Sequence, residues 1–87
     1  MSNLGLFKRR LGKFYIDTAL IESSPGTVFE ILSTVIVVRA EMRWDMDAIE
    51  YIGISHSFEC LPCGRRVPEY KAIFEQGRFT GWVNIDN

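Results

Sequence analysis

VIVVRAEMRW, residues 35–44, is the stretch of sequence that decides the fold class. Its apolar set is Ile36, Val38, Ala40, Met42 and Trp44, and its charged set is Arg39, Glu41 and Arg43. Successive side chains of a β-strand point to opposite faces, so the two sets would separate onto the two faces of a strand. A helix would instead scatter the three charges around its circumference. The stretch therefore predicts a β-strand with one buried face and one solvent-exposed face.

Four further segments have the composition or the alternation of strands. They are residues 13–22, 49–58, 69–75 and 80–85. The first is rich in β-branched and aromatic side chains, which favour strands, and apolar residues alternate along the second and third. Gly53 predicts a bulge or a close approach of another backbone. Turn-forming residues predict turns at residues 23–26, 45–47 and 76–77, and a loop over residues 59–68.

Residues 27–33, TVFEILS, fit two interpretations. Ser24 could cap a short helix with Pro25 at its first position, where proline is favoured. The Thr, Val, Phe and Ile residues of the segment, however, prefer strands, and a strand follows directly. We therefore favour a strand for this segment.

The fold class predicted from these elements is mainly β. Short connections favour antiparallel neighbours, because a parallel pairing needs a crossover of a dozen or more residues. The expected architecture is an antiparallel meander of five or six strands, either a small curled sheet or a barrel. Residues 13–87 would form this single β-rich domain. Residues 1–12 would be a basic N-terminal arm, either loose or holding one short helix.

The composition is that of a folded globular protein, with 47% hydrophobic and 24% charged residues among 87 and a net charge of −1. This balance argues against a broad nucleic-acid-binding surface. The arm is the exception, because aromatic side chains lie among Lys8, Arg9, Arg10 and Lys13. Binding of nucleic acid through the arm is therefore an alternative function. No apolar stretch is long enough for a signal peptide or a membrane span, so we expect a soluble, cytoplasmic protein without membrane association.

The cysteines allow a metal site but do not require one. Cys60 and Cys63, followed by Gly64, have the spacing of a zinc knuckle, and His56 lies four residues earlier. Structural zinc needs four ligands, so Glu59 or a second subunit would have to supply the fourth. Two cysteines without a ligand fit better, and so no cofactor is expected. Thiol–disulfide exchange is disfavoured, because no helix can begin at this cysteine pair.

No set of residues suited to catalysis emerges. Asp45, Asp47 and Glu50 could bind a divalent cation, act in hydrolysis, form a solvated turn, or meet a basic partner. No nucleophile or glycine-rich phosphate loop accompanies them. His56 is the only histidine, and a structural role suits it better than a catalytic one. We therefore expect a protein that is not an enzyme.

A surface that binds another protein is the remaining interpretation. The chain has too many aromatic residues for a small core to hide, and aromatic side chains beside arginines are favoured at interfaces. A homodimer is one such assembly. The predicted contacts with the partner are Arg39, Glu41, Arg43, Asp45, Asp47, Glu50, Arg65 and Arg66.

The run VRAEMRWDMDAIEYIGISHSF (residues 38–58), followed by a loop with proline and glycine and then VPEY (residues 67–70), covers about half the chain. It resembles small accessory proteins encoded by bacteriophages and prophages. Members of that class often block a host enzyme or defence complex by direct binding, as anti-CRISPR proteins do. The resemblance implies an inhibitor that acts by surface occlusion.

Overall fold

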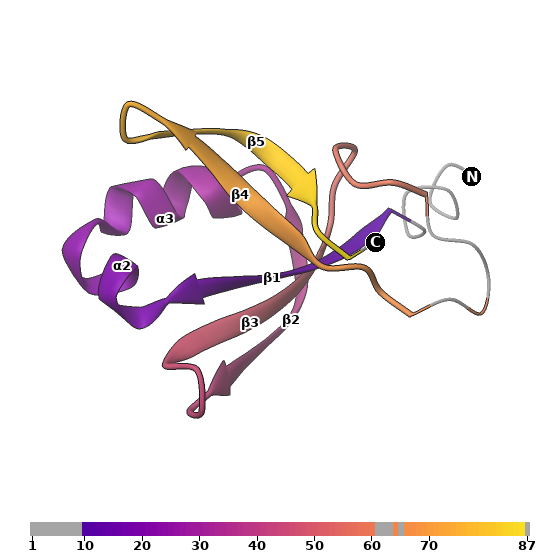
Figure 1. Ribbon diagram of the computed structural model, residues 1–87, viewed down its shortest axis with the longest axis horizontal. Helices are drawn as coiled ribbons and strands as arrows, with labels where there is room; N and C mark the ends of the chain where they lie inside the picture. The colour runs from indigo at the N-terminus through magenta and orange to yellow at the C-terminus, as the bar shows by residue number, and fades with distance from the viewer. Residues whose placement is uncertain (1–9, 61–63, 65, 87) are drawn as a thin grey trace.

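The structure is a computed structural model that describes residues 10–60, 64 and 66–86. Five strands and two helices follow one another along these residues (Figure 1). In chain order they are β1 (Leu11–Asp17), α2 (Thr18–Ser23), α3 (Pro25–Leu32), β2 (Ile36–Arg43), β3 (Ala48–Ile54), β4 (Tyr70–Glu75) and β5 (Arg78–Asn84). The prediction of a mainly β fold with five or six strands is confirmed. Residues 1–9, which make up most of the predicted arm, lie outside the described residues.

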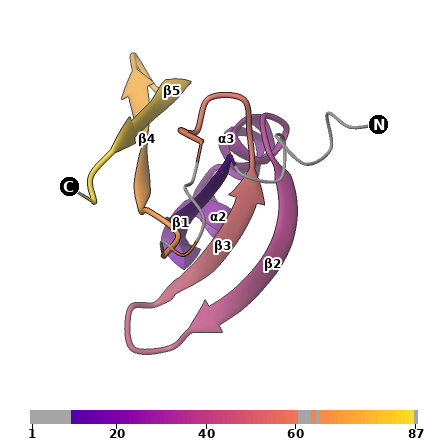
Figure 2. The same ribbon diagram turned by 90° about the vertical axis from the view of Figure 1, so that its right-hand side faces the viewer.

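The strands form two sheets, and the antiparallel pairing predicted from the short connections is confirmed. One sheet has the order β1-β3-β2, and β4 and β5 form a hairpin. The order differs from that of a meander, because the neighbour of β1 is β3 rather than β2. A parallel bridge between Lys13 and Glu69 links the two sheets, and the Lys13 amide donates a hydrogen bond of 2.9 Å to the Pro68 carbonyl. Figure 2 shows β2 at the outer edge of its sheet, away from the hairpin.

The strand predicted over residues 13–22 is correct only as far as Asp17, because α2 begins at the next residue. The reason lies in the partner strand. β3 begins at Ala48, directly opposite Asp17, so the chain beyond this point has no strand with which to pair. Thr18 marks the change, because its amide and hydroxyl both donate to the Asp47 carbonyl, at 3.1 and 3.2 Å. β1 also begins at Leu11, so the last two residues assigned to the arm belong to the sheet.

The strand favoured for residues 27–33 is wrong, because this segment lies almost entirely in α3. Val28, Ile31 and Leu32 are spaced by three and four residues, which places them on one helical face, and they pack into the core. The helix begins at Pro25, as the alternative interpretation required, although Ser24 makes no capping hydrogen bond with its side chain. This packing overrides the strand preference of the individual residues.

β2 is a strand as predicted, but the prediction of one buried face is wrong. Residues 36–41 are all exposed, because β2 is the edge of a sheet whose second layer does not extend over it. A bulge between Val37 and Arg39 also shifts the register by one residue. After the bulge, Ala40 and Met42 lie opposite Tyr51 and Ile49 on the core side. Before the bulge, toward the N-terminal end of β2, the residues on the two faces are exchanged relative to the predicted alternation.

The core is aromatic and lies between the three-stranded sheet, the hairpin and α3. Phe14 of β1 stacks on Tyr51 at 5.3 Å between ring centroids and lies 4.7 Å from Trp82 of β5. Phe58 is fully buried and stacks on Tyr70 at 4.4 Å. Aromatic pairs of this kind contribute about 0.5–1.5 kcal/mol each beyond their buried area. Trp82 contacts both Phe14 and Phe58, so it connects the hairpin to the rest of the core.

The remaining boundaries follow from local turns. β3 ends at Ile54, earlier than predicted, because Ser55 begins a turn in which its hydroxyl accepts the Ser57 amide at 3.0 Å. The close backbone approach predicted at Gly53 is confirmed, since a Cβ there would lie 3.2 Å from the Ile36 carbonyl oxygen. The described residues of the predicted loop, 59–60, 64 and 66–68, lie outside the strands, and the turn between β4 and β5 lies where it was predicted.

Candidate functional site

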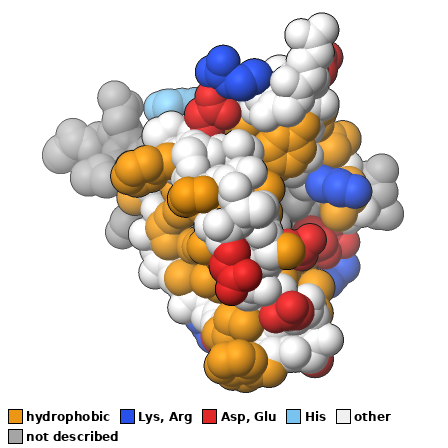
Figure 3. All heavy atoms as spheres, turned by 90° about the vertical axis from the view of Figure 1, so that its left-hand side faces the viewer, with side chains coloured by type: hydrophobic (Ala, Val, Ile, Leu, Met, Phe, Trp, Pro, Cys, Tyr) orange, Lys and Arg blue, Asp and Glu red, His pale blue; other side chains and the backbone are white. Residues whose placement is uncertain are grey.

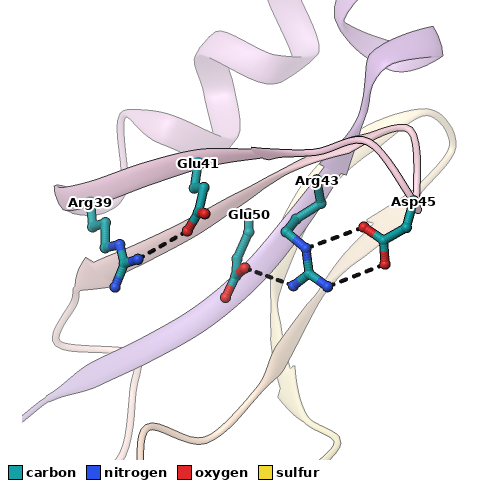
Figure 4. Close-up of polar contacts among 5 residues, drawn as sticks. All are labelled: Arg39, Glu41, Arg43, Asp45 and Glu50. Atoms are coloured by element: carbon teal, nitrogen blue, oxygen red, sulfur yellow. Dashed lines mark hydrogen bonds and ion pairs between the residues drawn. The ribbon is translucent and has the colours of Figure 1, made fainter.

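Most of the predicted partner-binding residues form two neighbouring groups of ion pairs on the outer face of the three-stranded sheet, together called the network below (Figure 4). Glu41 of β2 lies directly opposite Glu50 of β3. Two carboxylates in this position repel each other unless each is neutralised. Arg39 pairs with Glu41 at 2.9 Å, and Arg43 pairs with Glu50 at 3.0 Å. The two arginines therefore allow this register to form.

Arg43 is the centre of the network. Its Nε and Nη2 donate to the two carboxylate oxygens of Asp45 at 3.3 and 3.2 Å, and its Nη1 donates to Glu50. The hydrogen bonds to Glu50 and Asp45 raise the pKa of the Arg43 guanidinium above its usual range. A planar guanidinium that bridges two carboxylates fixes the end of β2 relative to the turn that follows it.

The other predicted contact residues lie apart from this network or outside the described residues. Asp47 lies in the β2–β3 turn with a positive φ of 54°, and its carbonyl accepts the hydrogen bonds from Thr18. Arg66 pairs with Asp86 at 3.0 Å, far along the chain from the network. Arg65 lies outside the described residues. The structure thus brings together Arg39, Glu41, Arg43, Asp45 and Glu50.

The tip of the β2–β3 hairpin, residues 44–47, exposes two large apolar side chains. Trp44 is 82% exposed and Met46 is 45% exposed. Neither residue is among the predicted contacts, although Trp44 is one of the aromatic residues too numerous for the core, because the alternation in β2 assigned Trp44 to a buried face. The signal was available in Asp45 and Asp47, which end the strand and turn the chain into solvent next to the tryptophan.

The described part of the basic arm has structural partners. Arg10 donates from Nη1 to the Phe58 carbonyl at 2.9 Å, and its own carbonyl accepts the Ser55 amide at 3.1 Å. Lys13 is half-buried in β1. Lys8 and Arg9 lie outside the described residues. Arg10 is therefore part of the fold as well as part of the predicted arm.

The predicted zinc ligands occupy the segment after β3. His56 and Cys60 are both exposed, and Cys63 lies outside the described residues. Across residues 10–60, 64 and 66–86, no group of three or more His, Cys, Asp or Glu side chains is placed to hold a metal ion. Asp45 and Glu50, two of the three predicted cation-binding carboxylates, are instead bound to Arg43.

A cavity of about 380 Å³ lies between β1 and β4, where the two strands separate beyond the Lys13–Glu69 bridge. Its lining is mainly apolar and includes Phe14, Ile16, Leu20, Ile31 and Phe74. The predicted architecture does not include this cavity, because a single continuous sheet would have left no such separation.

The surface near the helices mixes exposed hydrophobic side chains with separate acidic and basic groups, as Figure 3 shows. None of the helices in the described part of the chain is long and apolar enough to cross a membrane.

Comparison of the sequence and the structure with known protein families, curated proteins and solved structures gave no match.

Proposed function

We propose that this protein is a non-enzymatic protein-binding module and that the hairpin tip, residues 44–47, makes its central contact. The observation that carries the proposal is the 82% exposure of Trp44 at the end of a strand held in place by ion pairs. Tryptophan is enriched among the residues that supply most of the binding energy at interfaces. An exposed tryptophan on a fixed support therefore suits a contact with another macromolecule.

The network around Arg43 supports this role by reducing the cost of binding. Side chains that must be ordered on association each cost about 0.5–1.5 kcal/mol. Arg43 is already held by Asp45 and Glu50, and Asp45 is the direct neighbour of Trp44. Asp47 also places an exposed carboxylate at the tip, which is complementary to a basic group beside the partner's apolar pocket.

The charge distribution favours a protein partner over nucleic acid. Arg39, Arg43, Arg66 and Arg78 each form an ion pair with a carboxylate of the same chain. Nucleic-acid binding depends on cations that are available to phosphate. Contact through Lys8, Arg9, Arg10 and Lys13 remains the second proposal. Its test is a mobility shift at two salt concentrations, with and without residues 1–9.

The kind of partner follows from the resemblance to phage and prophage accessory proteins. We propose a host enzyme or defence complex in the cytoplasm, which the protein inhibits by covering a functional surface.

A small domain stabilised by zinc through His56, Cys60 and Cys63 is a separate alternative. Elemental analysis of the purified protein tests it, because one zinc ion per chain or per dimer would support it.

Affinity purification from the native host, with mass spectrometry, identifies the partner that is retained by the wild-type protein. Binding of that purified partner is then measured by calorimetry for the wild type, Trp44→Ala and Phe29→Ala. Phe29 is the matched control, because it is a 77% exposed aromatic side chain on α3. We expect Trp44→Ala to weaken binding about 30-fold or more, as for a central interface residue, and Phe29→Ala to have little effect. Equal binding by Trp44→Ala and the wild type would refute the proposal.

A further inference from the structure

The outer edge of β2 has the properties of a strand that pairs with another strand. Among the described residues, β2 pairs only with β3, so its second edge presents free backbone donors and acceptors. Val38 is 53% exposed and Ile36 is 54% exposed along this edge. Natural proteins usually protect such an edge with proline, charged side chains or a bulge. β2 contains no proline, its bulge lies near the N-terminal end, and its charged side chains are neutralised by ion pairs within the chain.

The charges of β2 determine which strand would fit against it. Arg39, Glu41 and Arg43 alternate in sign at every second residue on one face, and Asp45 continues the alternation. In an antiparallel pair, residues directly opposite each other point to the same face and interact. Two copies of β2 related by a two-fold axis therefore attract or repel each other according to the residue at the axis.

An axis at a charged residue gives repulsion. With the axis at Glu41, Glu41 lies opposite itself and Arg39 lies opposite Arg43; with the axis at Arg43, Arg43 lies opposite itself. Two uncharged centres, Ala40 and Met42, give attraction. An axis at Ala40 places Arg39 opposite Glu41 twice. An axis at Met42 places Arg43 opposite Glu41, but Arg43 already makes three hydrogen bonds to Asp45 and Glu50. Arg39 makes one, to Glu41, so Ala40 is the centre at which the arginine is least committed to its own chain.

We propose that β2 pairs antiparallel with β2 of a second copy of this chain, with the two-fold axis at Ala40. The regular pairing covers residues 39–41, because Val38 is the bulged residue and interrupts it on one side. The two three-stranded sheets then form one six-stranded sheet. Each Arg39 lies opposite Glu41 of the second copy. This self-association goes beyond the proposed function, because it uses the strand edge rather than the hairpin tip.

Charge exchange tests both the association and its register. Sedimentation equilibrium of the full chain is measured for the wild type, Arg39→Glu, Glu41→Arg and the double variant. We expect a wild-type dimer, a dissociation constant at least 10-fold weaker for each single variant, and recovery of the dimer in the double variant. The double variant would not recover with the axis at Met42, because position 41 would then face Arg43. A wild-type monomer at all concentrations, unchanged single variants or a double variant that stays monomeric would each overturn the proposal.

Cross-linking gives a second, independent readout. Opposite residues of antiparallel strands have Cα atoms about 4.5–5.5 Å apart, within the range that a disulfide spans. Ala40→Cys, in a chain with Cys60→Ser and Cys63→Ser, should form a covalent dimer rapidly when copper phenanthroline is added as the oxidant. Ala19→Cys, exposed on α2, is the control for random collision. Cross-linking at position 40 that is no faster than at position 19 contradicts the proposed axis.

Discussion

Glu30 on α3 and Arg78 at the start of β5 are joined by two hydrogen bonds of 2.6 and 2.9 Å, which both end on Glu30 Oε2. The other carboxylate oxygen accepts the Phe79 amide at 3.4 Å. The residues are 48 positions apart, and the pair connects the helix to the β4–β5 hairpin. The hydrogen bond from Arg78 is the main cause that lowers the pKa of Glu30 below its usual value.

This pair predicts how stability depends on pH. A carboxyl group with a lowered pKa in the folded state stabilises the fold above its unfolded pKa of about 4.3, and this contribution is lost as the pH falls through the folded pKa. Glu30→Gln should therefore be less stable than the wild type at pH 7, with the difference shrinking as the pH falls below about 4. Urea unfolding at pH 7 and over the acid range measures this. Glu22→Gln, which removes an exposed carboxylate on α2, is the matched control.

Gly12 and Gly26 are predicted to respond oppositely to alanine. A Cβ at Gly12 would lie 2.7 Å from the Phe58 ring and 2.8 Å from the Tyr70 ring, and both rings are buried. Gly12→Ala should lower the free energy of unfolding by about 1–3 kcal/mol, because the rings must move. A Cβ at Gly26 would meet nothing within 4 Å, so Gly26→Ala in α3 should raise it by about 0.4–1 kcal/mol. Urea unfolding that shows the same sign for both variants would contradict this packing.

The strands that sequence analysis predicted correctly are those with a partner close along the chain. β2 and β3 are joined by a short turn, as are β4 and β5, so local alternation and turn residues were sufficient. The helices were missed for the opposite reason. Only the position of Ala48 opposite Asp17 shows that β1 must end, and that pairing spans more than thirty residues.

The candidate site was predicted in part for a similar reason. The alternating charges of β2 correctly placed Arg39, Glu41 and Arg43 on one face, because that face depends only on local periodicity. The exposure of Trp44 depends on which layer covers β2, which the alternation along β2 does not record; the only local indication of it is the pair of aspartates that follows. The bulge at Val38 likewise arises from the pairing with β3, and it reverses the face assigned to Ile36.

Gln76 and Gly77 form the two-residue turn between β4 and β5, and both have positive φ values, of 53° and 77°. Gly77→Ala should destabilise the protein by about 1–2 kcal/mol, because a side chain in this conformation approaches the following carbonyl. Gln76→Asn should stabilise it by up to about 1 kcal/mol, since asparagine followed by glycine is the preferred sequence of such a turn. Thermal unfolding of both variants tests the turn. A loss of stability in Gln76→Asn would contradict the assigned conformation.

Tyr70 connects the start of β4 to the segment after β3. Its hydroxyl accepts the Glu59 amide at 2.8 Å, and its ring stacks on the buried Phe58. Tyr70→Phe keeps the stacking and removes the acceptor, so it should cost about 0.5–1.5 kcal/mol, which is the net contribution of a typical hydrogen bond. Tyr15→Phe, on the half-buried outer position of β1, should cost less.

Hydrogen exchange separates the local effect of the Tyr70 hydroxyl from a general loss of stability. The Glu59 amide should exchange faster in Tyr70→Phe than the decrease in global stability requires, whereas the Lys13 amide, bonded to Pro68, should follow global stability. If both amides change equally, the hydroxyl does not hold Glu59 in place.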